Sequence, residues 1–187
     1  MPSFRSVGAI LLALHLAANV AQAQSGHRHE AFWIGFGIGG GWSTTEGQSE
    51  EGLGGGAGYF RLGGTLNQRW LLGGEIIGWG RAEEGIRYSR GNTTFVVLFF
   101  PSTTGGLFLK GGIGTSYVDV SGDLVGFGFS VSRVGFGTTF GLGWDVKLGN
   151  NIYLTPNADL LFQAIETASG DDRNTAILAF TLGLTWH

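Results

Sequence analysis

Cysteine is absent from this chain of 187 residues, and charged residues make up only 13% of it. Without a thiol the chain can form no disulfide, use no cysteine nucleophile and carry no lipid on a mature N-terminal cysteine. The 11 lysines and arginines stand against 14 acidic residues, which gives a formal net charge of −3. Because there is no basic patch, nucleic acid is not an expected partner.

A hydrophobic run long enough to cross a bilayer as a helix, about 20 residues, is also missing. The apolar run over residues 7–18 follows Arg5 and is too short for a helical anchor. It precedes a small-x-small sequence that ends at Ala23. These features predict a secretory signal peptide over residues 1–23, cleaved after Ala23. Residues 24–187 then form one domain.

Glycine is abundant, with 36 residues, and it alternates with large apolar side chains. Between Val134 and Leu148 the bulky apolar residues occupy every second position, and glycines occupy most of the positions between them. A period of two indicates a β-strand with two different faces. Asp145 and Lys147 share the glycine face. This face is expected to line a narrow polar lumen, and the bulky face to meet lipid.

Eight segments alternate in this way, which predicts an all-β fold, an eight-stranded antiparallel up-and-down transmembrane β-barrel. A soluble lipocalin-like barrel is the rival, and it would place the bulky face inside. The predicted strands are residues 32–42, 52–66, 69–80, 93–100, 107–120, 134–148, 152–165 and 174–186. The strand at 93–100 is apolar on both faces, so its register stays open. Trp79 has inward parity, which a bulge could reverse.

The connections alternate between long charged loops and short turns, as in outer-membrane barrels. The long connections, which would lie outside the cell, are residues 43–51, 81–92, 121–133 and 166–173. Within the third, an apolar stretch at 124–131 leaves a second possibility, that the hairpin continues above the membrane.

The last predicted strand places Phe180, Leu182, Leu184 and Trp186 on its outward face. This pattern resembles the C-terminal insertion signal of the small eight-stranded outer-membrane barrels of the OmpA/OmpX type, although His187 follows the final aromatic residue. The resemblance implies export to the bacterial outer membrane and insertion by the barrel-assembly machinery. It also implies contact with outer-membrane lipids and lipopolysaccharide, and a monomeric state.

Charged side chains with inward parity are the candidate functional residues of the lumen. Because isolated charges in a narrow lumen are costly, they are expected to pair and to form a structural plug. A proton or ion path, or a gate, is the alternative. The predicted lumen network is Arg61, Glu75, Lys110, Asp145, Lys147 and Asp159.

No catalytic site is expected. The glycines at 35, 37 and 40 match a dinucleotide fingerprint but lie within a strand, so the phosphate-binding geometry is missing. After signal cleavage histidine remains only at His27, His29 and His187, near the periplasmic termini. A serine nucleophile in the outer loops would therefore lack a base. The first two histidines are expected to belong to a solvated tail, with no metal site and no cofactor.

The sequence thus predicts an outer-membrane barrel with a structural or surface-interaction role, four extracellular loops and no enzymatic activity. The first alternative is a small pore or a carrier for hydrophobic or small solutes. The second is an enzyme that modifies lipid A.

Overall fold

The computed structural model describes residues 29, 31–45, 53–124, 127–166 and 172–187, and the predicted signal peptide lies outside these residues. Over the described residues the chain forms β-strands and no helix. The strands are β1 (Phe32–Thr45), β2 (Leu53–Asn67), β3 (Trp70–Glu83), β4 (Ile86–Phe99), β5 (Leu107–Leu124), β6 (Phe127–Trp144), β7 (Val146–Lys147), β8 (Ile152–Glu166) and β9 (Asp172–Trp186).

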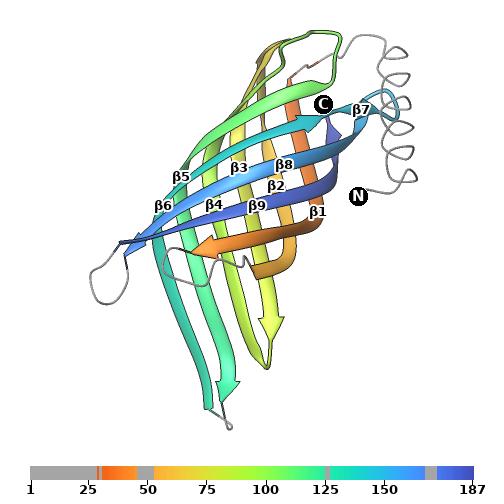
Figure 1. Ribbon diagram of the computed structural model, residues 1–187. Helices are drawn as coiled ribbons and strands as arrows, with labels where there is room; N and C mark the ends of the chain where they lie inside the picture. The colour runs from red at the N-terminus through yellow and green to blue at the C-terminus, as the bar shows by residue number, and fades with distance from the viewer. Residues whose placement is uncertain (1–28, 30, 46–52, 125–126, 167–171) are drawn as a thin grey trace, which may run out of the picture.

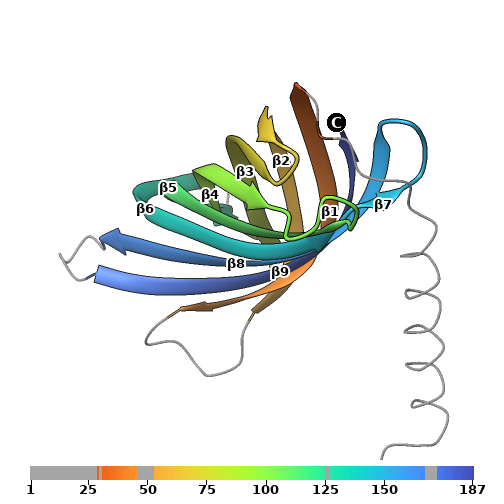
Figure 2. The ribbon, with the colours of Figure 1, turned by 90° about the horizontal axis from the view of Figure 1, so that it is seen from above.

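Apart from β6 and β7, each strand pairs with its neighbours in the sequence, all antiparallel, and β1 pairs with β9 (Figure 1). β6 pairs with β8 and closes the sheet, so that the strands surround a common interior (Figure 2). The short β7 continues the course of β6 along β8, which gives a barrel of eight strands. Closure pairs the backbone groups that an open sheet edge would expose to lipid. The predicted transmembrane β-barrel is confirmed.

Large apolar side chains cover the outer wall of the barrel. Their exposed fractions lie between 42% and 79% for Phe36, Ile38, Phe60, Ile76, Phe95, Ile113, Phe140, Phe162 and Leu182. The alternate positions point inward and are buried, including Trp33, Leu71 and Ile177 at 0%. A soluble barrel would reverse these two faces, so the structure excludes that rival.

Two apolar clusters fill the interior at different heights. The first contains Trp33, Leu71, Val96, Leu98, Phe100 and Phe108, near the end of the barrel where the chain terminates at His187. The second contains Tyr59, Ile77, Trp79, Leu161 and Ile177. Trp79 keeps its inward parity with no bulge in β3, and its indole nitrogen donates a hydrogen bond to the carbonyl of Gly41 at 3.1 Å.

The predicted charged loop at residues 81–92 is wrong. β3 and β4 pair without interruption up to Glu83 and Ile86, and only Glu84 and Gly85 connect them. Both connecting residues have positive φ, 49° and 81°, the combination that a tight type I′ hairpin turn requires. The register left open for this strand also becomes fixed, because Phe95 points outward while Val96 and Leu98 point inward.

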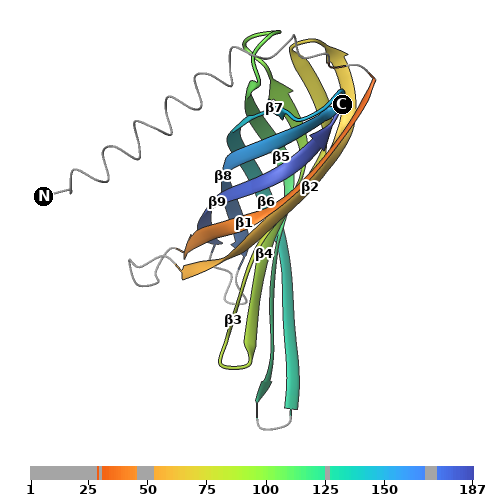
Figure 3. The ribbon, with the colours of Figure 1, turned by 90° about the vertical axis from the view of Figure 1, so that its right-hand side faces the viewer.

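The predicted loop at residues 121–133 is likewise wrong, and the alternative of an extended hairpin is confirmed. β5 and β6 pair as far as Leu124 and Phe127, whereas β8 pairs with β6 only from Phe136 onward. Both hairpins therefore extend beyond the other strands, at the end of the barrel away from His187 (Figures 1 and 3). The four strands β3–β6 form one continuous sheet there, which we call the projecting sheet.

The predicted strand at residues 134–148 is not continuous, because β6 stops at Trp144 and pairing resumes at Val146. By register, Trp144 and Asp145 would pair with Pro156 and Thr155. Proline has no backbone N–H to donate, so the ladder breaks there. The amide of Asp145 instead donates to the carbonyl of Gly106 at 2.9 Å.

Candidate functional site

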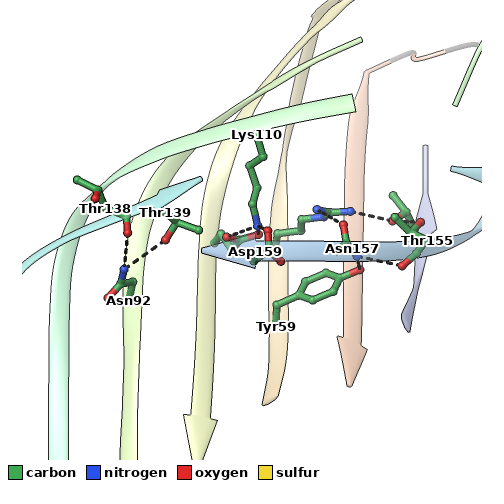
Figure 4. Close-up of polar contacts among 11 residues, drawn as sticks. Tyr59, Asn92, Lys110, Thr138, Thr139, Thr155, Asn157 and Asp159 are labelled. Carbon is green, nitrogen blue, oxygen red and sulfur yellow. Dashed lines mark hydrogen bonds and ion pairs between the residues drawn. The ribbon is translucent and has the colours of Figure 1, made fainter. Parts of the chain in front are cut away.

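A buried lysine bridges two carboxylates between the two apolar clusters. The Nζ atom of Lys110 on β5 lies 2.6 Å from Oε2 of Glu75 on β3. It also lies 2.8 Å from Oδ1 of Asp159 on β8 (Figure 4). All three side chains are at most 1% exposed. Inward glycines such as Gly141, where a Cβ would collide with the Asp159 carboxylate, leave the room that these long side chains occupy.

Arg61 lies beside this group, as the cross-strand partner of Glu75. Its guanidinium lies between two aromatic rings, 4.8 Å from the centroid of Tyr59 and 5.0 Å from that of Phe108. It donates long hydrogen bonds of 3.4 Å to Asn157 and Thr185. Aromatic faces attract a cation, so the rings supply part of what water would have given the buried guanidinium.

A second polar group lies at the end of the barrel that carries His187. The hydroxyl of Thr155 donates to Oδ1 of Asp145 at 2.7 Å, and Nε2 of His187 lies 3.2 Å from Oδ2. The Nδ1 atoms of His187 and His29 lie 3.2 Å apart. Both histidines are buried, at 7% and 2% exposed. The expectation of a solvated tail is therefore wrong for His29, while His27 lies outside the described residues.

Of the six predicted lumen residues, the structure brings Glu75, Lys110 and Asp159 into direct contact and places Arg61 beside them. Asp145 belongs to the separate histidine group. Lys147 is half-buried on β7, and among the described residues it makes no ion pair.

The predicted lumen network contained charged residues alone, and the structure adds neutral polar residues to it. The side-chain amide of Gln163 donates to Asn92 at 3.0 Å and to the carbonyl of Gly91 at 2.8 Å. Asn92 in turn donates to the carbonyl of Thr138 at 2.9 Å (Figure 4). Alternation predicts that Gln163 faces inward, as the structure shows. Asn92 was assigned to a loop, and it has inward parity only because β4 begins at Ile86.

The predicted insertion-signal residues Phe180, Leu182, Leu184 and Trp186 all point outward from β9, between 38% and 53% exposed. They share the outer wall with the rest of the apolar belt. They make no part of the lumen network.

On the projecting sheet the two faces exchange character. Nearer the barrel centre, β5 and β6 carry Ile113, Tyr117 and Phe136 outward. Beyond this level the outward positions are small or polar, and Ser132 donates to Asp119 at 2.6 Å. The inward positions become apolar instead. Tyr88, Val120 and Val131 lie in one such cross-strand row, which begins at the charged Arg81.

Among the described residues, no helix is long and apolar enough to span a bilayer, and no group of three metal-ligating side chains is present.

No protein-family description and no curated sequence matches the chain. Solved structures match its fold. The attachment invasion locus protein Ail of Yersinia pestis superposes with a TM-score of 0.61 at 15% identity, covering 84% of this chain and 99% of Ail. Neisserial surface protein A superposes with a TM-score of 0.59 at 12% identity, covering 86% of this chain and 99% of that protein. The resemblance to small eight-stranded outer-membrane barrels is thus confirmed for the fold.

Proposed function

We propose that this chain is a bacterial outer-membrane protein whose barrel holds the projecting sheet outside the cell for contact with a partner protein. The barrel itself is a plugged anchor with no enzymatic activity. The single observation that carries the proposal is the free edge of the projecting sheet. Ail, whose name records attachment, has the same barrel architecture, which supports a surface role for this chain.

The free edge belongs to β6 over residues Phe127–Gly135. This segment pairs with β5 on one side, and β8 reaches β6 only at Phe136. Within the part of the chain that the structure describes, half of its backbone N–H and C=O groups therefore have no strand to receive them. An extended segment of a partner can add to such an edge, with backbone hydrogen bonds providing affinity.

The interior supports the plugged anchor. The ion pairs of Lys110 with Glu75 and Asp159 lie across the lumen between β5, β3 and β8. Apolar clusters lie on either side of them. An eight-stranded barrel is just wide enough for side chains to fill it, so such a filling stiffens the wall instead of leaving a channel. Lipopolysaccharide and membrane lipids would surround the outward apolar belt.

The surface role is tested by shortening one hairpin. Replacing Asp119–Ser132 with Asn-Gly joins the paired residues Val118 and Arg133 by a two-residue turn. Bacteria that produce the shortened chain should attach to cultured epithelial cells less well than bacteria that produce the full chain. The exposed Arg87→Gln on the outer face of the same sheet is the matched control and should attach normally. Equal attachment by the shortened chain, at equal amounts on the surface, would refute the role.

A further inference from the structure

The inner face of the projecting sheet is apolar where the sheet has left the membrane. One cross-strand row places Tyr88, Val120 and Val131 side by side. In the next row, Gly122 lies between Ile86 and Phe129. Val131 is 51% exposed. Side chains that face lipid need no other cover, but this apolar face lies beyond the apolar belt of the barrel and stays partly exposed, so it can hold a ligand.

The outer face of the same segment argues against membrane lipid as that cover. Its positions include Ser121, Ser130 and Ser132, and Asp119 accepts a hydrogen bond there. The apolar face is turned toward the axis of the barrel, away from the surrounding bilayer. Its ligand therefore arrives from the external medium.

Below this face the lumen is closed. Trp79, Ile177 and Leu161 are buried in the second apolar cluster, and Tyr88 packs against it. A ligand can rest on this floor and against the sheet, but the cluster blocks its passage down the barrel. The feature is therefore a binding site and not the mouth of a channel.

Two arginines give the site a charge. Arg90 and Arg133 lie in one cross-strand row on either side of Val118. Since adjacent strands lie 4.7–4.9 Å apart, their backbones are about 10 Å apart. Among the described residues neither makes an ion pair, whereas Arg81 is paired with Glu83 at 2.8 Å. Arg90 also donates to Thr175 at 2.7 Å, which holds it over the floor.

We propose that this inner face binds a medium-chain fatty acid, or a closely similar amphiphile with one anionic head group. The carboxylate lies between Arg90 and Arg133, because guanidinium groups form strong charge-assisted hydrogen bonds with it. The alkyl chain lies along the sheet past Val120 and Val131 toward Phe129. The four residue steps from Val118 to Gly122 extend about 13 Å, the length of such a chain. The site does not depend on strand addition at the β6 edge.

The test uses the full chain in lipid nanodiscs and a dodecanoic acid with a photoreactive diazirine near the end of its chain. After irradiation, the cross-linked peptides are mapped. Saturable labelling should fall on residues 118–122, 128–133 and 86–90, and free dodecanoate should compete for it. Dodecanol and dodecyltrimethylammonium, which lack the anion, should compete at least tenfold less well.

Arg133→Gln should weaken competition by dodecanoate about tenfold or more, because it removes one charged donor. Val131→Asp, which places a negative charge beside the alkyl chain of the anionic ligand, should abolish the labelling. Arg87→Gln on the outer face is the matched control and should leave the labelling unchanged. Heat-modifiable gel mobility verifies that every variant has folded.

Labelling confined to the outward apolar belt would overturn the proposal. Equal effects of Arg133→Gln and Arg87→Gln would also overturn it, and so would equal competition by dodecanol.

Discussion

The ammonium of Lys110 lies 2.6 Å from the Glu75 carboxylate, and neither side chain is exposed to solvent. Their strands, β3 and β5, are separated by β4. The two residues are therefore not cross-strand neighbours, and their side chains meet in the interior of the barrel. Together with Asp159 they form the polar centre on which the filling of the lumen depends.

Replacing Lys110 should destabilise the barrel strongly. Lys110→Met leaves two carboxylates buried without their cation, which costs about 3–5 kcal/mol. The free energy of unfolding in urea, followed by tryptophan fluorescence in lipid vesicles, measures this loss. The exposed Arg87→Gln should change it by less than about 0.5 kcal/mol. A loss no larger for Lys110→Met than for Arg87→Gln would show that the ion pairs do not hold the lumen together.

The stability of the barrel should also depend on the hydroxyl of Thr155. It donates its one proton to Asp145 at 2.7 Å, its oxygen lies 2.9 Å from the Thr185 hydroxyl, and all three residues are buried. Thr155→Val keeps the shape but removes a donor from a buried carboxylate, so it should cost about 1.5–3 kcal/mol in the same unfolding experiment.

Thr115→Val is the control for Thr155→Val, because Thr115 is exposed on the outer wall. It should be neutral or slightly stabilising. If the two variants unfold alike, the hydrogen bonds of Thr155 contribute nothing to stability.

The glycine positions should differ sharply in how well they tolerate substitution by alanine. A Cβ on Gly183 would collide with the Tyr59 hydroxyl and the carbonyl of Phe36. Gly183→Ala should therefore cost about 1–3 kcal/mol by overpacking. Gly74 has no atom within 4 Å of such a Cβ. Gly74→Ala should be tolerated, and unfolding curves that rank the two variants in the opposite order would contradict the packing described for the lumen.

Because its lumen is plugged, the barrel should not conduct ions. In planar bilayers the purified chain should show no steady ohmic conductance, because side chains fill the lumen from Trp33 to Trp79. Open-channel currents of porin size through the monomer would favour the alternative of a pore.

Alternation with a period of two was enough to predict the number of strands, the closed barrel and which side chains face inward. It failed on the projecting sheet. At Tyr117 and Val118 the apolar residues change faces, so residues 121–133 resemble a loop although they pair as strands. The prediction for residues 81–92 failed because the charged side chains there lie on paired strands and not in a loop.

The candidate site could be predicted only in part. Parity placed Glu75, Lys110 and Asp159 in the lumen, but which charges meet depends on the stagger between distant strands. Nothing in the spacing of the sequence fixes that stagger. The burial of His29 against His187, 158 residues apart, is likewise a product of barrel closure.

The central claim is that the apolar side chains of this barrel meet lipid while their neighbours fill the interior. The absence of cysteine allows single spin labels to be placed at Leu182 and at Thr181, adjacent residues of β9 with 53% and 5% exposure. In lipid bilayers, collision with molecular oxygen should be frequent for the label at position 182 and rare for the label at position 181. A label at position 182 that is shielded from oxygen, with position 181 open to it, would contradict the account.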